Sequence, residues 1–115
     1  MIINLTQHSA TADQVAAGVV DLSGDALTDL RDALTFDSIP TREEIRNRSE
    51  YIAQLAVSHE AEAAMIGGAP YLMSALEKEL KAAGITPLYA FSTRESVEQK
   101  QLDGGVRKVN IFRHI

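Results

Sequence analysis

The stretch Ala63-Ala64-Met65-Ile66-Gly67-Gly68-Ala69-Pro70 (AAMIGGAP, residues 63–70) decides the fold class. Four apolar residues in a row are too short for a helix and are typical of a buried strand. The two glycines indicate a tight turn, and Pro70 suits the first position of a helix because its missing amide proton would have no partner there. The segment therefore predicts a strand that turns directly into a helix, which is the unit of an α/β sheet.

The rest of the chain alternates in the same way. Short apolar runs at Met1–Leu5, Val19–Leu22 and Leu88–Phe91 predict three more strands. Helices are expected at residues 12–17 and 26–34, after Thr41 and after Pro70, where capping-box pairs or apolar residues at intervals of three and four occur. Residues 106–112 alternate imperfectly and predict a final antiparallel strand at the sheet edge.

These elements predict one Rossmann-like α/β domain over residues 1–115. Strands that alternate with helices favour three layers, with a mainly parallel sheet covered on both faces. Right-handed crossovers favour the strand order 2-1-3-4 with the fifth, antiparallel strand at the edge. In that order the winding direction reverses between the first and the third strand.

Composition excludes several classes of protein. The 115 residues include no cysteine, so disulfides and thiolate metal sites are excluded. A net charge of -5 argues against binding duplex DNA through a broad basic surface, although Arg94, Arg107, Lys108 and Arg113 gather in the last quarter. No signal peptide and no apolar run of membrane-spanning length is present, so a cytoplasmic location is expected.

Three polar segments follow strands of the predicted sheet. They are Thr6-Gln7-His8, Gly67-Gly68 and Ser92-Thr93-Arg94. Ligands of open α/β sheets bind beyond the carboxyl ends of the strands, where the winding direction reverses. Glycines let the backbone approach a ligand, and the helix that follows offers amides and a positive dipole end to an anion. Arg94 could contact a phosphate through two hydrogen bonds, and His8 could transfer a proton near neutral pH.

Each of these residues also has a plain structural interpretation. The glycine turn can serve only as a connection, because neither GxGxxG nor the P-loop pattern is present. His8 can be a solvated loop residue, and Arg94 can pair with Glu95. Tyr71, in the first turn of the helix after the glycines, can stack on a base or pack in the core. The hydroxyls of Thr6, Ser92 and Thr93 can bind a ligand or satisfy loop amides.

Other chemistry has little support. The three histidines share no metal-ligand spacing, so no metal site and no cofactor is expected. His59 lies on the apolar stripe of a helix and is expected to be packed or at a pocket edge. The charged run Arg42–Glu50 is expected to be a solvated helix face, and no GxSxG elbow points to a serine hydrolase.

The segments Asn4–Gln14, Gly67–Met73 (GGAPYLM) and Pro87–Arg94 (PLYAFSTR) together resemble small stand-alone CRISPR-associated Rossmann-like (CARF-like) proteins, a group that includes ring nucleases. The resemblance implies a homodimer that binds cyclic oligoadenylate across its two-fold axis. Members that cleave this ligand need no metal and use a ribose 2′-hydroxyl to attack the adjacent phosphate. Position by position, Thr6, His8, Gly67, Gly68, Thr93 and Arg94 would line the ligand site. The short chain and its negative net charge depart from this pattern.

The leading hypothesis is therefore recognition, with or without degradation, of a cyclic or linear adenosine nucleotide. In a cleavage reaction, Arg94 and the helix amides after Gly68 would stabilise charge on the phosphate, and His8 would assist proton transfer. A second hypothesis is a module that senses or sequesters a nucleotide without turnover. A third is a dimeric interaction protein whose edge strand, residues 106–111, pairs with a partner.

Overall fold

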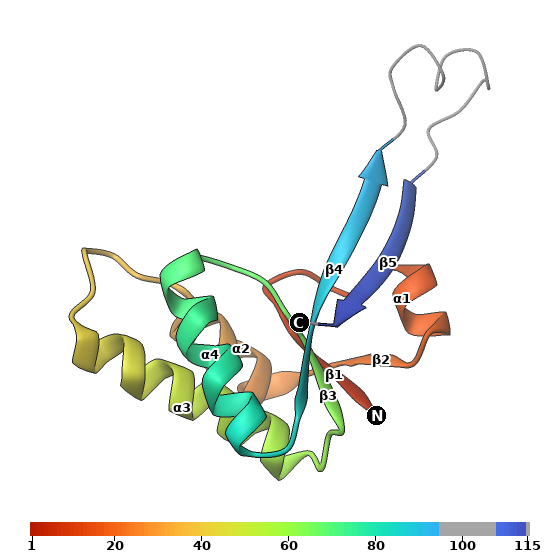
Figure 1. The fold of residues 1–115 in the computed structure, drawn as a ribbon. Coiled ribbons are helices and arrows are strands. Elements are labelled where there is room, and N and C mark those ends of the chain that lie inside the picture. Colours follow the sequence, from red (N-terminus) through yellow and green to blue (C-terminus); the bar gives the residue numbers. More distant parts are fainter. Residues whose placement is uncertain (95–107, 115) are drawn as a thin grey trace.

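The computed structural model describes residues 1–94 and 108–114, and the side chains of residues 1–90. Along these residues strands alternate with helices (Figure 1). The elements are β1 (Ile2–Leu5), α1 (Ala12–Ala16), β2 (Val19–Asp21), α2 (Gly24–Leu34), α3 (Arg42–Ser58), β3 (Ala63–Ile66), α4 (Pro70–Ala82), β4 (Thr86–Arg94) and β5 (Lys108–His114). The strand at residues 63–66 and the helix that begins at Pro70 confirm the prediction from the AAMIGGAP segment.

The strands form one sheet in the order β2-β1-β3-β4-β5, as predicted. β1 pairs in parallel with β2 and β3, β3 pairs in parallel with β4, and β5 runs antiparallel to β4. The chain crosses from β1 to β2 in one direction and from β2 over β1 to β3 in the other. This reversal confirms the mainly parallel, Rossmann-like α/β class.

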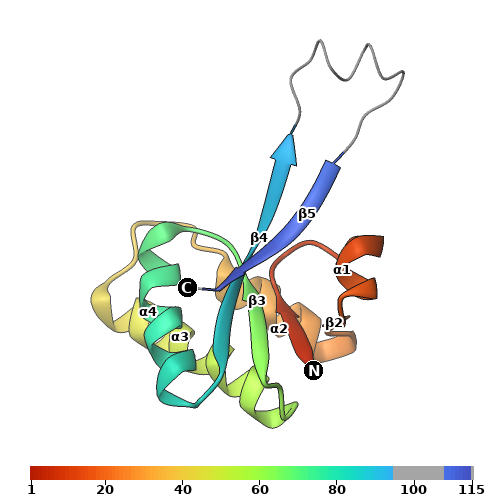
Figure 2. The ribbon, with the colours of Figure 1, turned by 45° about the vertical axis from the view of Figure 1, so that its right-hand side comes forward.

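Helices cover the two faces of the sheet unequally. α2, α3 and α4 lie together on one side, and α1 lies on the other (Figure 2). Ile3 and Leu5 of β1 and Ala64 and Ile66 of β3 point toward the three helices and belong to the main apolar core. Among the described elements, the only helix on the second face is the five-residue α1, which contacts β2 and β5. The expectation of two helix-covered faces therefore holds fully for one face only.

β4 is longer than the sequence predicts. The expected strand was Leu88–Phe91, but β4 continues through Ser92, Thr93 and Arg94. It can do so because β5 supplies hydrogen-bond partners beyond the end of β3, with pairs from Ala90↔Phe112 to Arg94↔Lys108. The two strands project as a ribbon beyond the rest of the sheet (Figure 1). The turn predicted at residues 104–105 lies outside the described residues.

Both predicted capping boxes are present. The Thr11 hydroxyl accepts a bond from the Gln14 amide at 3.2 Å, and the Gln14 side chain accepts one from the Thr11 amide at 2.9 Å. Thr41 and Glu44 exchange the same pair of bonds at the start of α3. These bonds satisfy amides that have no partner within the helix, which explains where α1 and α3 begin.

The prediction that His59 is packed or lies at the edge of a pocket is wrong. His59 caps the carboxyl end of α3 and is exposed, with its Nδ1 atom 2.7 Å from the Leu55 carbonyl oxygen. The apolar stripe of α3 ends before it, because Ala56 is the last fully buried residue of the helix. Within residues 1–94 and 108–114, the structure shows no helix long and apolar enough to cross a membrane.

Candidate functional site

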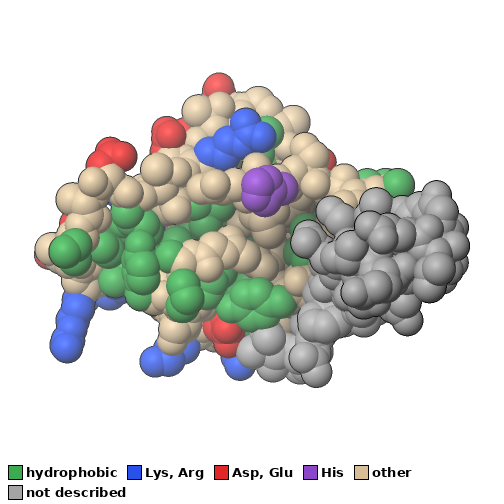
Figure 3. Space-filling view, turned by 90° about the horizontal axis from the view of Figure 1, so that it is seen from above, with side chains coloured by type: hydrophobic (Ala, Val, Ile, Leu, Met, Phe, Trp, Pro, Cys, Tyr) green, Lys and Arg blue, Asp and Glu red, His purple; other side chains and the backbone are tan. Residues whose placement is uncertain are grey.

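A cavity of about 570 Å³ opens over the carboxyl ends of β1 and β3, between the β1–α1 segment and β4. We call this cavity the strand-end cleft. Five of the residues predicted for the site line it, namely Thr6, Gln7, His8, Gly67 and Gly68. Figure 3 looks onto this end of the molecule, where a histidine side chain lies at the surface. The first and third strands thus bring two of the three predicted segments together.

The Gly67-Gly68 turn forms one wall of the cleft. Gly68 has φ +155, a backbone conformation that favours glycine. A Cβ atom on Gly67 would lie 3.6 Å from the Thr6 methyl group, so the turn packs directly on the β1–α1 segment. The N-cap residue Ala69 gives α4 no side-chain hydrogen bond. The positive end of this 13-residue helix therefore borders the cleft without a side-chain cap.

The opposite wall is shaped by Asn4, which the sequence pattern did not single out as a site residue. Its side chain is 3% exposed and donates to the His8 carbonyl oxygen and to Asp21 Oδ1, both at 2.8 Å. Its amide oxygen accepts bonds from the Thr6 amide at 2.9 Å and the Thr6 hydroxyl at 2.7 Å. Asp21 Oδ1 also accepts a bond from the Ala10 amide at 3.0 Å. Asn4 and Asp21 therefore fix the segment that presents His8. The interruption of the apolar run MIINL by Asn4 was the available signal.

His8 lies between two cavities. Its exposed side chain borders the strand-end cleft and also a smaller cavity of about 90 Å³. Arg31 of α2 borders this smaller cavity, so a cation lies close to His8. The sequence gave no reason to connect Arg31 with His8, since 22 intervening residues separate them. The described lining of the strand-end cleft itself includes no lysine or arginine.

Tyr89 closes the cleft from the β4 side. Its phenol donates a hydrogen bond of 2.7 Å to Glu77 Oε2 of α4. Burial, and then this hydrogen bond to a carboxylate, raise the pKa of Tyr89 well above its ordinary value of 10.0. Tyr89 is therefore a neutral hydrogen-bonding group at physiological pH and adds no charge to the cleft.

The remaining predicted residues are not among the described lining of the cleft. Tyr71 is half exposed and contacts Phe36, with ring centroids 5.6 Å apart, outside the lining of the cleft. Arg94 lies five residues beyond Tyr89, which pairs with Ile66 at the end of β3. Five extended residues span roughly 16 Å. β4 does not end level with β3, so the backbone of Ser92, Thr93 and Arg94 continues beyond Ala90, which lines the cleft. Their placement beside Gly67 stays a prediction, and Arg94 is the farthest of the three along the strand.

Within the part of the chain that the structure describes, no group of three or more histidine, aspartate or glutamate side chains could hold a metal ion. The architecture is that of a small doubly wound α/β protein with a cleft at the point where the winding reverses, the usual ligand position in such sheets. The chain belongs to the family described as the Uncharacterized protein MJ1673 family, which it matches over residues 1–115. Searches of curated proteins and of solved structures find no match.

Proposed function

We propose that the strand-end cleft binds a nucleotide, with a phosphate group beside the Gly67-Gly68 turn. One observation carries the proposal: the His8 segment and the glycine turn form the two walls of a single cavity where the winding of the sheet reverses. Its volume of about 570 Å³ lies within the range of roughly 300–1,000 Å³ that is usual for small-molecule sites.

The charges near the cleft favour a ligand with few phosphates. The amino end of α4 attracts an anion through its dipole, and Arg31 adds one cation near His8. No lysine or arginine belongs to the described lining of the cleft, and the net charge of the chain is -5. A long polyanion would be repelled by the net negative charge of the chain. One or two phosphates at the helix end, whether of a mononucleotide or of one part of a cyclic oligoadenylate, would not need a basic surface.

Within the nucleotide class, the candidate taken from the family resemblance is cyclic oligoadenylate. In its cleavage, a ribose 2′-oxygen would form a bond to the adjacent phosphorus while the bond from phosphorus to the 5′-oxygen breaks. The products would be a 2′,3′-cyclic phosphate and a 5′-hydroxyl. The exposed imidazole of His8 could accept the 2′-hydroxyl proton or supply the proton that the 5′-oxygen gains.

Sensing or sequestering without turnover is the second candidate. The backbone position of Arg94 favours binding without turnover. Arg94 was predicted to contact the reacting phosphate, but it lies on the β4–β5 ribbon, roughly 16 Å along β4 from Tyr89, the partner of Ile66. A cleft with a helix end and one histidine can hold a phosphate, but it has fewer groups to stabilise the additional charge of a transition state.

The test uses cyclic tetra-adenylate, cyclic hexa-adenylate and AMP as probes. Calorimetry measures binding and chromatography measures products. We expect binding of at least one probe and, if the site is catalytic, a loss of about 100-fold in turnover for His8→Ala with little change in affinity. His59→Ala is the matched control, because His59 is an exposed histidine that caps α3 and lines no part of the cleft. Binding without products would identify a sensing module. No binding of any probe would refute nucleotide binding.

A further inference from the structure

An apolar hollow of about 540 Å³ lies at the junction of the α2–α3 connection and the first turn of α4. Its apolar lining comprises Phe36, Ile39, Pro40, Ile45 and Tyr71. We call Phe36, Ile39, Pro40 and Tyr71 the aromatic shelf. Ile39 is 94% exposed and Tyr71 is 48% exposed, which is unusual for side chains of this size. Apolar side chains extend over this end of the molecule beside the histidine (Figure 3).

Lining residues of the strand-end cleft and of the aromatic shelf lie two positions apart at two places in the chain. Leu34 at the end of α2 lines the cleft, and Phe36, two residues later, lines the shelf. Ala69 lines the cleft before α4, and Tyr71, two residues later, lines the shelf. Two residues span at most roughly 7 Å, which is the scale of the separation between phosphate and base within one nucleotide.

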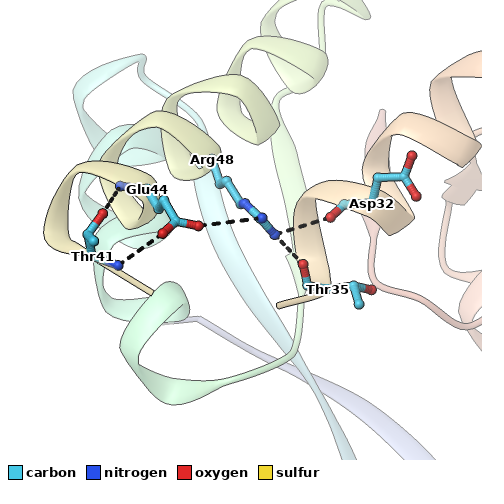
Figure 4. A network of polar contacts seen from close by, with 5 residues as sticks. All are labelled: Asp32, Thr35, Thr41, Glu44 and Arg48. Carbon is cyan, nitrogen blue, oxygen red and sulfur yellow. Dashed lines mark hydrogen bonds and ion pairs between the residues drawn. The ribbon is translucent and has the colours of Figure 1, made fainter. Parts of the chain in front are cut away.

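Contacts from Arg48 hold the Phe36 end of the shelf in place before any ligand arrives. The Arg48 guanidinium lies 4.1 Å above the centre of the Phe36 ring. It also donates to the carbonyl oxygens of Asp32, at 3.3 Å, and Thr35 at the end of α2. Figure 4 shows these bonds together with the ion pair to Glu44, whose side chain also closes the capping box of α3. Both ends of the α2–α3 connection are therefore fixed, so little conformational entropy would be lost when a flat ligand binds there.

We propose that the aromatic shelf is the subsite for the purine base of the nucleotide whose phosphate binds in the strand-end cleft. This inference rests on the proposed function and adds to it the position of the base. A purine offers a flat apolar face to Tyr71 and to the exposed Ile39 side chain, and stacking of a base on an aromatic side chain stabilises binding. Asp37 and Ser38, at the rim of the hollow, are polar groups within the same subsite that can face the edge of the base.

The experiment compares AMP with ribose 5-phosphate, which carries the same phosphate and sugar but no base. Calorimetry on the wild-type protein should give a dissociation constant for AMP about tenfold lower than that for ribose 5-phosphate. Tyr71→Ala should remove most of this difference by weakening AMP alone. Tyr51→Ala is the matched control, because Tyr51 is similarly exposed, at 42%, but lies on α3 outside the hollow. It should leave both affinities unchanged.

Four results would overturn the base subsite. Equal wild-type affinities for the two ligands, or an unchanged AMP affinity in Tyr71→Ala, would leave nucleotide binding in place without a base on the shelf. If Tyr71→Ala instead weakens self-association and leaves AMP affinity unchanged, the shelf is a contact between copies of the chain. Binding of neither ligand would refute the phosphate site together with the base subsite.

Discussion

Asn4 connects the sheet to the candidate site at the scale of single residues. The amide nitrogen of Asn4 donates hydrogen bonds to His8 and Asp21, and its amide oxygen accepts two from Thr6. Asn4 is buried, so water could not replace a lost hydrogen-bond partner. Each lost bond would leave a buried polar group unsatisfied, which lowers stability. The position of His8 therefore depends on an amide at residue 4, and a carboxylate of the same shape cannot replace it.

The first prediction concerns the substitution Asn4→Asp. The introduced carboxylate would face Asp21 Oδ1, 2.8 Å away in the native pair, and could not donate to the His8 carbonyl oxygen. We expect the free energy of unfolding at pH 7 to fall by about 3 kcal/mol, measured by urea denaturation. Repulsion from Asp21 would raise the pKa of the introduced carboxyl in the folded state. The stability loss should therefore grow as pH rises through the acid range and shrink when the carboxyl is protonated.

The matched control adds Asp21→Asn to Asn4→Asp. The exchanged pair has one amide and one carboxylate again, so a hydrogen bond between the two side chains can re-form. The double variant should recover part of the lost stability, although the bond to His8 stays broken. If the double variant is no more stable than the single one, repulsion from Asp21 is not the cause of the loss.

At the scale of elements, α3 shows how one charged run can contain two kinds of residue. Arg42–Glu50 was expected to be a solvated face, and this holds for Arg46 and Glu50, whose side chains are 64% and 52% exposed. It is wrong for Arg48, whose side chain turns to the end of α2 and to Phe36. Arg48 can reach these groups because α2 ends beside this part of α3, and the sequence pattern of α3 alone does not show where α2 ends.

The second prediction compares these two arginines. Arg48→Ala removes hydrogen bonds to the carbonyl oxygens of Asp32 and Thr35 and the contact with Phe36, so unfolding free energy should fall by about 1–2 kcal/mol. Arg46→Ala removes only an exposed ion pair with Glu50 and should change it by less than about 0.5 kcal/mol. Equal losses in the two variants, measured by thermal or urea unfolding, would contradict the stabilising role of Arg48.

At the scale of the whole molecule, the two unequal faces of the sheet and the β4–β5 ribbon are unusual for a doubly wound fold. The described helices cover one face with three elements and the other with α1. From Ala90 onward, β4 has β5 as its neighbour and no pairing with β3, and isolated two-stranded ribbons are marginally stable in water. Both features favour burial against another chain.

The third prediction is therefore that the protein forms a homodimer. The resemblance to CARF-like proteins implies the same state. Sedimentation equilibrium at micromolar concentration should give twice the chain mass of 12.5 kDa. A shortened chain that ends after Ala90 would lose the ribbon, and we expect it to sediment as a monomer or to be markedly less stable. A wild-type protein that remains monomeric across the concentration range would refute the dimer.

The sequence by itself determined the kind and order of the elements. Strand lengths, capping boxes, glycine turns and Pro70 act within a few residues of one another, so their patterns can be seen in one dimension. The strand order followed because right-handed crossovers leave few arrangements. That order makes β1 and β3 parallel neighbours, and it correctly placed the His8 segment beside Gly67-Gly68 at their carboxyl ends.

Only the tertiary structure decided which distant residues meet. Asp21 reaches Asn4 through the pairing of β1 with β2, and Arg31 reaches the neighbourhood of His8 through the position of α2. The backbone of Arg94 lies beyond the end of β3 because β5 continues to pair with β4. These contacts depend on strand register, on helix position and on the point where a strand finds no further partner. Such quantities arise from packing between segments far apart in the chain, and local spacing in the sequence does not encode them.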